Sequence, residues 1–319
     1  MLRENERYNI TMDALITSMQ PIMPFLQDKE VFEVYINPNG KIWTDGLAKG
    51  RDFTGEYISP EATRAIILGV AALTDQLIKQ ERPVLDAEIP ENDFFPKCRF
   101  EGNLPNIVAA PTLNIRKHPE KIFTLDDYVE FGVLSERQHE ILLTAIHEKK
   151  NIIAAGGTKS GKTTFLNAIL AEISKLEDRV ILIEDTPELQ CTADDCVQMR
   201  ATSTFSMADC LKQVLRMTPD RIVVGEVRSD EALALLDAWS TGHGGGCSTV
   251  HSNSAEETLL RLENLTSRVS RNPQQATIAQ AVNLILYLTY VGKRRKVREI
   301  VEIKGWDPVQ KKYMLAPVI

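Results

Sequence analysis

Apolar residues change their spacing partway along the chain, and the first part has the pattern of a small mixed domain. The segment "VFEVYINPNGKIWTDG" has two apolar runs around an Asn-Gly turn, which is a strong hairpin signal. Apolar positions in "EATRAIILGVAALTDQLIKQ" recur at helical spacing, and the short extended pieces "CRFEG" and "NIVAAPTLNIRK" follow. This pattern predicts an α+β domain over residues 1–120.

The second part alternates short apolar strands with helices. It follows a linker at residues 121–134, in which Thr124 caps a short helix. The strands "NIIAA", "RVILIED", "RIVVGE" and "CSTVH" are separated by helical segments. Such alternation indicates a mainly parallel sheet with helices on both faces. We therefore predict an α/β domain over residues 135–319, which ends in two strands joined by a basic turn.

Composition narrows the class of protein. A length of 319 residues suits about two domains, and 43% hydrophobic with 25% charged residues is typical of a globular protein. The net charge of −7 argues against non-specific coating of nucleic acid. The five cysteines form no C-x-x-C pair, which favours reduced thiols in a cytoplasmic protein. No apolar run approaches the ~18 residues that a membrane span needs.

A phosphate-binding loop follows the strand "NIIAA". Gly156-x-x-x-x-Gly161-Lys162-Thr163 matches the complete P-loop pattern between a strand and a helix. The glycines let backbone N–H groups approach an anion, and the helix N-terminus adds partial positive charge. Lys162 is expected to reach the β- and γ-phosphates of ATP, and Thr163 to bind Mg²⁺. The predicted nucleotide-binding residues are Gly156, Gly157, Thr158, Lys159, Ser160, Gly161, Lys162, Thr163 and Thr164.

Lys159 is unusual, because many such loops carry glycine there. It either adds positive charge near the phosphates or points into solvent, and we favour solvent. Carboxylates at the ends of later apolar strands supply the acid that a P-loop needs for Mg²⁺ or its water. Glu226 ends "RIVVGE", while Glu184, Asp185 and Glu188 lie in "RVILIEDTPE". Loop, acids and β/α alternation together predict an ATPase that converts ATP and water to ADP and phosphate.

Three segments in order resemble the secretion traffic ATPases. They are "GGTKSGKTT", "IEDTPELQ" and "RMTPDRIVVGEVRSDEALALLDAWSTGHGGGCSTVHSNSA". The chain is most similar to the conjugative-transfer, type IV secretion branch of the TrbB type, and "CRFEGNLPNIVAAPTLNIRK" resembles the N-terminal domain of that branch. The resemblance implies a RecA-like ATPase domain, a smaller N-terminal domain and a hexameric ring with nucleotide between the domains. It implies a motor for pilus biogenesis and substrate transfer.

The resemblance also implies roles for individual residues. Glu188 is the expected water-activating or water-orienting carboxylate, Glu226 positions Mg²⁺ and its water, and His251 senses the γ-phosphate. Arg99 and Arg116 are expected to reach the phosphates from the N-terminal domain. By the same likeness we place Arg216, Arg221 and Arg228 near the site, and His243 lies in the same histidine box as His251, with its role left open.

Partners and alternatives follow from the same likeness. It implies a homo-hexamer at the inner membrane, associated with inner-membrane components and a coupling protein of the secretion apparatus. The basic segment 292–298, "GKRRKVR", allows peripheral contact with anionic lipid. A pilus assembly or retraction ATPase is the nearest alternative, although the chain lacks the four-cysteine cluster of assembly members. A helicase-like nucleic-acid motor is a weaker alternative. Only the basic segment 292–298 supports it, so direct nucleic-acid binding is not favoured.

Overall fold

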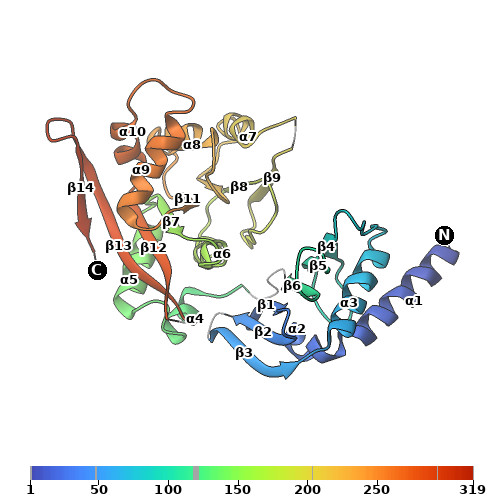
Figure 1. Ribbon diagram of the computed structural model, residues 1–319. Helices are drawn as coiled ribbons and strands as arrows, with labels where there is room; N and C mark the ends of the chain where they lie inside the picture. The colour runs from blue at the N-terminus through green and yellow to red at the C-terminus, as the bar shows by residue number, and fades with distance from the viewer. Residues whose placement is uncertain (1, 47–48, 118–121, 203, 293, 319) are drawn as a thin grey trace. The chain divides into compact units, whose positions relative to one another are not determined.

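Two separate hydrophobic cores divide the chain into the units Met1–Lys121 and Ile122–Ile319. The computed structural model describes residues 2–46, 49–117, 122–202, 204–292 and 294–318 (Figure 1). Residues 122–134, which we predicted as a linker, belong to the second unit. Their apolar side chains explain this placement, because Phe123, Leu125 and Tyr128 are all buried. The Tyr128 ring meets Phe165 edge to face, with centroids 4.9 Å apart.

The first unit is built on a six-stranded antiparallel sheet with the order β3-β2-β1-β6-β5-β4. The predicted hairpin is present, because β1 pairs with β2 across a turn that Gly40 closes at φ +74°. Helix α3 begins after Ser59, whose side chain accepts a hydrogen bond from Ala62 N. The elements are α1 (Leu2–Met19), η1 (Gln20–Ile22), α2 (Met23–Gln27), β1 (Val31–Ile36), β2 (Lys41–Gly46), β3 (Gly50–Tyr57), α3 (Pro60–Leu73), β4 (Val84–Ile89), β5 (Cys98–Asn103) and β6 (Thr112–Lys117).

The second unit is built on an eight-stranded sheet with the order β14-β13-β12-β7-β11-β10-β8-β9. The strands from β9 to β12 in this order are parallel, as the β/α alternation predicted, and β13 and β14 extend the sheet in antiparallel fashion. The strands are β7 (Ile152–Gly156), β8 (Val180–Glu184), β9 (Cys196–Arg200), β10 (Arg221–Val224), β11 (Cys247–His251), β12 (Leu284–Val291), β13 (Arg294–Asp307) and β14 (Lys312–Pro317).

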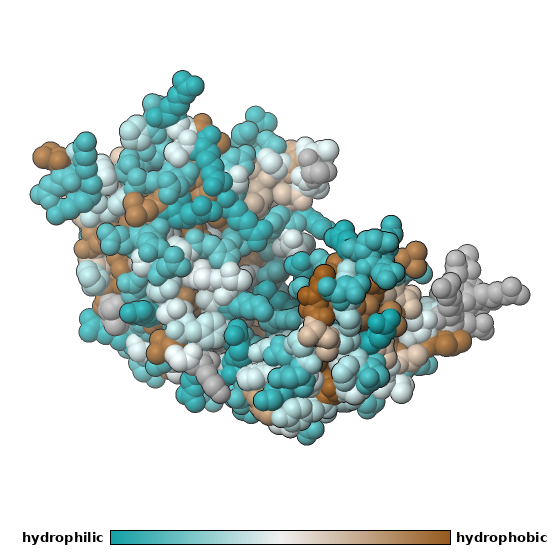
Figure 2. All heavy atoms as spheres, viewed as in Figure 1, coloured by the Kyte–Doolittle hydropathy of each residue, from teal (hydrophilic) through white to brown (hydrophobic). Residues whose placement is uncertain are grey.

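Helices cover both faces of this sheet. Alternate strand residues such as Ile153, Ile181 and Val224 form one core with α7 to α10, while α6 packs against β7 and β11. No helix among the described residues is long and apolar enough to cross a membrane, and hydrophilic residues predominate on the face seen in Figure 2. The helices are α4 (Leu125–Glu130), α5 (Glu136–His147), α6 (Lys162–Ile173), α7 (Met207–Val214), α8 (Glu231–Ser240), α9 (Ala255–Thr266) and α10 (Gln275–Ala281).

Arg221 ties together the edge of the sheet where the parallel strands begin. It is the first residue of β10 and only 1% exposed. Its guanidinium donates to Asp178 Oδ2 at 2.7 Å, to Gly245 O at 3.0 Å and to Ile146 O at 2.9 Å. The glycine loop follows the carboxyl end of β7, so Arg221 lies at the opposite edge. Our placement of Arg221 near the nucleotide was therefore wrong, because its donors are committed to holding three connecting segments.

We predict that Arg221→Met lowers the free energy of unfolding by about 3 kcal/mol, because a buried charge network loses its central donor. Arg216→Met is the matched control, since Arg216 is exposed in the turn before the same strand. Urea denaturation of both variants measures the difference. Equal stability of the two variants would contradict the structural role of Arg221.

Candidate nucleotide-binding site

The phosphate loop has a backbone that its glycines require. Strand β7 ends at Gly156 and helix α6 begins at Lys162. A Cβ on Gly156 would collide with the Leu288 carbonyl and the Ser160 hydroxyl. Gly161 has φ +91°, in the left-handed region that side chains disfavour. Both motif glycines are thus fixed by close approach or by backbone conformation.

Lys162 is held inside this loop. Its side chain comes from the first turn of α6, and the residue is 6% exposed. Lys162 Nζ donates to Gly157 O at 2.9 Å, and Ser160 N donates to the same oxygen at 3.3 Å. These are donors of the kind that bind a phosphate oxygen in a P-loop. The Gly157 carbonyl therefore occupies their hydrogen-bonding capacity in this conformation.

Three further side chains lie at the carboxyl edge of the sheet, where the glycine loop follows β7, because the strands that carry them are parallel and adjacent. The order β7-β11-β10-β8 brings together the strand ends at Gly156, His251 and Glu184, with Glu226 two residues beyond β10. His251 is the register partner of Gly156. The carboxyl edge of a parallel sheet is the usual ligand site of such folds. The chain thus gathers its predicted phosphate, acid and histidine segments at one edge.

The side chains at this edge form a continuous polar series. Lys162 Nζ lies 3.3 Å from His251 Nδ1, and His251 Nε2 lies 3.1 Å from Glu226 Oε1. The series continues through Arg228, which bonds Glu226 Oε2 at 2.6 Å and Asp185 Oδ2 at 2.8 Å. Basic and acidic groups therefore follow one another from the phosphate loop to Asp185, just after β8.

His251 is neutral within this series. Burial, followed by the positive charge of Lys162, lowers the pKa of His251 below its usual 6.5. Because the Lys162 ammonium can only donate, His251 Nδ1 must accept, which places the ring proton on Nε2 facing Glu226. A neutral imidazole thereby connects the loop lysine to the acid.

Acidic residues at this edge divide into two kinds. Glu184 is buried and accepts from Glu188 N, Leu189 N and Gln198 Nε2, so it shapes the turn that carries Glu188. Its role is structural. By contrast, Glu188 acts on Arg228. The pKa of Arg228 is raised first by its hydrogen bond to Glu226 and then by the charges of Glu226 and Asp185. The half-buried Glu188 adds a smaller effect in the same direction. Glu188 and Glu226 thus act on one guanidinium.

The residues present fit a Mg²⁺-bound triphosphate. Ser160 Oγ is buried without a hydrogen bond to any described residue, while Glu226 Oε1 faces His251 Nε2 at 3.1 Å. The hydroxyl of Thr163 and the carboxylate of Glu226 are the hard oxygen ligands that Mg²⁺ prefers. A buried hydroxyl and a carboxylate near a lysine amine suit a ligand that brings both phosphate oxygens and a cation.

Comparison with known proteins shows the family of the chain. The family model for type II/IV secretion system proteins matches residues 60–302. The chain belongs to this family. Among its relatives is the probable conjugal transfer protein TrbB of Sinorhizobium fredii, 43% identical over 281 residues, which are 88% of this chain and 85% of the relative. The type IV secretion system protein VirB11 of Bartonella quintana is 28% identical and covers 95% of this chain and 96% of its own.

A solved structure shows the same fold. The ATPase DotB of Legionella pneumophila aligns with a TM-score of 0.62 at 21% identity, covering 90% of this chain and 79% of that one. The matched family region contains the phosphate loop and the polar series at the carboxyl edge. The chain therefore shares both its family and its fold with secretion proteins.

The two arginines that we expected to reach the phosphates from the N-terminal domain lie side by side in the first unit. Arg99 on β5 and Arg116 on β6 are register partners, and both are exposed. An ion pair joins Arg99 to Asp86 at 3.6 Å, with both side chains 70% exposed, so solvent screens it strongly. Their approach to the phosphates of the second unit stays a prediction.

Other predicted residues lie elsewhere in the second unit. Arg216 and His243 precede β10 and β11, so they lie toward the amino ends of these strands with Arg221, and not at the glycine loop. Our placement of Arg216 near the nucleotide was wrong, because connections entering parallel strands gather at that opposite edge. Arg228 does lie in the polar series, and Lys159 is exposed, as we favoured.

Two residues of the site escaped sequence analysis. Buried Glu231 begins α8 and accepts hydrogen bonds from Arg228 N and Ser229 N, which fixes the backbone beside Glu226. Arg295, which we assigned to an exposed basic turn, is 5% exposed and bonds the phosphate loop. A signal existed for Arg295, because strand alternation puts it on the same face as Val297, two residues later.

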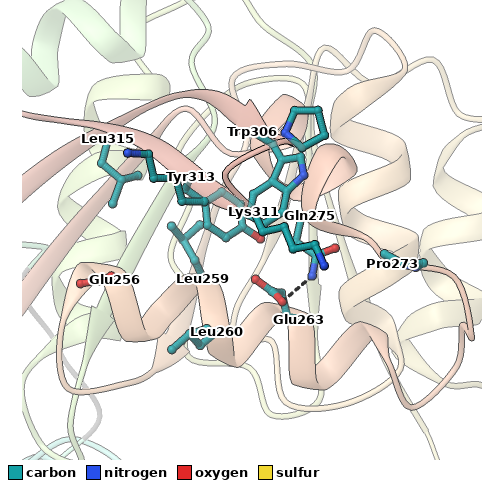
Figure 3. Close-up of a pocket in the computed structure, with 12 residues that line it drawn as sticks. Glu256, Leu259, Leu260, Glu263, Pro273, Gln275, Trp306, Lys311, Tyr313 and Leu315 are labelled. Carbon is teal, nitrogen blue, oxygen red and sulfur yellow. Dashed lines mark hydrogen bonds between the residues drawn. The ribbon is translucent and has the colours of Figure 1, made fainter.

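A separate hollow lies between α9 and the β13–β14 hairpin. Its volume is about 660 Å³, and its walls include Leu259, Trp306 and Tyr313 (Figure 3). Glu263 accepts a hydrogen bond from Gln275 at its floor. None of the predicted nucleotide-binding residues lines this hollow, so it is distinct from the phosphate loop.

We predict that His251 titrates below pH 6.5 and that Lys162→Ala raises its pKa, because the lysine charge disfavours imidazolium. NMR of the labelled imidazole over a pH series measures both values. Since the folded state binds this proton less tightly than the unfolded chain, His251 opposes folding as the pH falls below about 6.5.

Lys159→Ala is the matched control for this titration, because Lys159 is an exposed lysine of the same loop. Its substitution should leave the His251 midpoint in place. An unchanged or lower midpoint in Lys162→Ala would show that the lysine does not set the state of the histidine.

Proposed function

We propose that this chain is a Mg²⁺-dependent ATPase that acts as a motor of a type IV secretion or conjugative DNA transfer system. The observation that carries the ATPase proposal is the convergence of Lys162 Nζ and Ser160 N on Gly157 O inside a complete phosphate-loop motif. The conjugative role is supported by 43% identity to a probable conjugal transfer protein over most of both chains.

In this proposal, ATP binding redirects donors that the loop already holds. Lys162 and the Ser160 N–H exchange the Gly157 carbonyl for phosphate oxygens, while Thr163 and Glu226 hold Mg²⁺. Bound Mg²⁺ neutralises charge on the β- and γ-phosphate oxygens. Glu226 must then share its carboxylate, which Arg228 engages at 2.6 Å.

Hydrolysis requires a water in line with the γ-phosphorus. In our proposal, Glu188 accepts the proton of that water as the new P–O bond forms and the bond to the β–γ bridging oxygen breaks. The electron pair of the broken bond leaves with ADP. His251, neutral and joined to both Lys162 and Glu226, is placed to report whether the γ-phosphate is present. Arg228 supplies positive charge beside the two carboxylates.

The motor step rests on the two exposed arginines of the first unit. We propose that Arg99 and Arg116 close on the γ-phosphate and that hydrolysis removes the charge that holds them, so that the units move apart. The second unit would act as a RecA-like domain within a homo-hexameric ring. An adjacent guanidinium pair is well suited to charge spread over a transferring phosphoryl group.

The proposal places the ring in the cytoplasm, at the inner membrane. Its partners would be inner-membrane components and the coupling protein of the secretion apparatus. Peripheral contact with anionic lipid would use Arg294, Lys296 and Arg298, which are exposed, whereas Arg295 is buried and unsuited to it. Direct nucleic-acid binding is not part of the proposal.

We predict that Lys162→Ala lowers ATP turnover by at least about a hundredfold, because the transferring phosphoryl loses its main cationic ligand. Lys175→Ala is the control: this lysine lies just beyond the same helix, 61% exposed and paired only with Glu172 among the ion pairs described. Phosphate release by the purified chains measures the effect.

The same variants test the role in the cell. In donor cells that lack their own copy, the wild type and Lys175→Ala should restore plasmid transfer, and Lys162→Ala should not. Equal ATP turnover by Lys162→Ala and the wild type would refute the ATPase proposal. Turnover without restored transfer would refute the conjugative role alone.

We predict that the double variant Arg99→Ala/Arg116→Ala lowers kcat by about 10³-fold, the usual range for loss of an arginine finger. Arg64→Ala is the control, an exposed arginine on α3 in the same unit. Steady-state kinetics with the full chain measures kcat. A double variant as fast as Arg64→Ala would remove the first unit from the chemistry.

A further inference from the structure

The β12–β13 hairpin contacts the phosphate loop from outside the motif. Tyr290 OH, on β12, donates to Lys159 O at 3.2 Å. Arg295, on β13, donates to the same oxygen from both Nε and Nη2, each at 3.3 Å. The guanidinium lies over the Tyr290 ring, 5.0 Å from its centroid. One loop carbonyl is thus bonded by two side chains of a distant segment.

The bonded carbonyl belongs to a residue with an unusual backbone conformation. Lys159 has φ +62°, in the left-handed region, although it is not glycine. A trans peptide is planar, so its C=O and the following N–H point in opposite directions. Anchoring Lys159 O toward the hairpin therefore turns Ser160 N–H the other way, where it meets Gly157 O at 3.3 Å. That N–H is one of the two donors that converge in the loop.

Packing reinforces the contact at both ends of the loop. Arg295 Cδ would lie 3.2 Å from a Cβ on Gly161, so the arginine stem fills space that glycine leaves open. At the other end, Leu288 on β12 is the register partner of Gly156. The hairpin thus fixes the start, the end and one internal peptide of the loop.

Burial separates Arg295 from the other cations of its strand. Arg294, Lys296 and Arg298 are exposed, whereas Arg295 is 5% exposed. Placing a guanidinium inside a protein is costly unless it is well bonded. Its position also puts a permanent positive charge directly behind a loop that is built for an anion.

We propose that Arg295, supported by Tyr290, is a positioning residue of the phosphate loop: it holds the Lys159–Ser160 peptide so that Ser160 N–H faces the triphosphate. The inference rests on the proposed ATPase function. Arg295 acts through the loop backbone and not by touching the nucleotide.

The test is to measure the affinity of the full chain for a non-hydrolysable ATP analogue with Mg²⁺ by calorimetry, with kcat and thermal unfolding in parallel. Arg295→Met keeps the stem but loses every donor, and we expect its Kd to rise about tenfold, as for loss of charged hydrogen bonds. Arg295→Lys should recover part of the affinity, and Tyr290→Phe should weaken binding about threefold. Arg298→Met, on the same strand but exposed, should bind like the wild type.

Each result separates this inference from its alternatives. A purely structural role would lower the unfolding temperature of Arg295→Met and leave its Kd unchanged, which would overturn the proposal. If Arg295→Met does not fold, wild-type Kd values in both Arg295→Lys and Tyr290→Phe would overturn it. A wild-type chain that binds no analogue would refute the ATPase function itself, before any variant is compared.

Discussion

The polar series at the carboxyl edge of the sheet depends on the buried positive charge of Lys162. Lys162 is only 6% exposed, and an ammonium removed from water must be compensated by nearby acceptors. The loop supplies Gly157 O, and β11 supplies the neutral Nδ1 of His251. Burial, followed by the lysine charge, lowers the pKa of His251, and the ring faces Glu226. The protonation of His251 therefore depends in part on the lysine.

Charged residues at the two edges of the sheet do different work. At the amino edge, Arg221 donates to a carboxylate and two backbone carbonyls, and this buried network ties connecting segments together. At the carboxyl edge, the Arg228 side chain is 56% exposed and pairs with the carboxylates of Asp185 and Glu226, for which a metal ion would compete. Both residues are arginines beside β10, so their chemistry alone does not explain their different roles. Their roles differ because Arg221 lies at the amino end of this parallel strand and Arg228 lies beyond its carboxyl end.

Much of the fold and part of the site were predictable from sequence. The Asn-Gly turn gave the first hairpin, and β/α alternation gave the mainly parallel sheet. The complete loop motif identified Lys162, because few other patterns need glycines at both ends of a turn before a helix. The strand order was not predictable, since period and propensity are local. The adjacency of His251 and Gly156 therefore emerges only when β11 is seen beside β7.

The misplaced segments have separate physical causes. Arg216 and Arg221 are close in sequence to site residues, but the chain crosses the sheet between them. Residues 122–134 were taken as a linker because they lie between the two predicted domains, yet Tyr128 packs against Phe165 of the loop helix. Arg295 lies in a run of basic residues. Only the alternation of side chains between the two faces of a strand distinguishes its buried position from the exposed positions beside it.

The most direct test of the account is a crystal structure of the full chain with Mg²⁺ and a non-hydrolysable ATP analogue. The account predicts the triphosphate within residues 156–163, Lys162 Nζ moved from Gly157 O to a phosphate oxygen, and Lys159 O still bonded to Arg295. A triphosphate bound elsewhere, or a Lys162 amine that stays on Gly157 O beside it, would contradict the account.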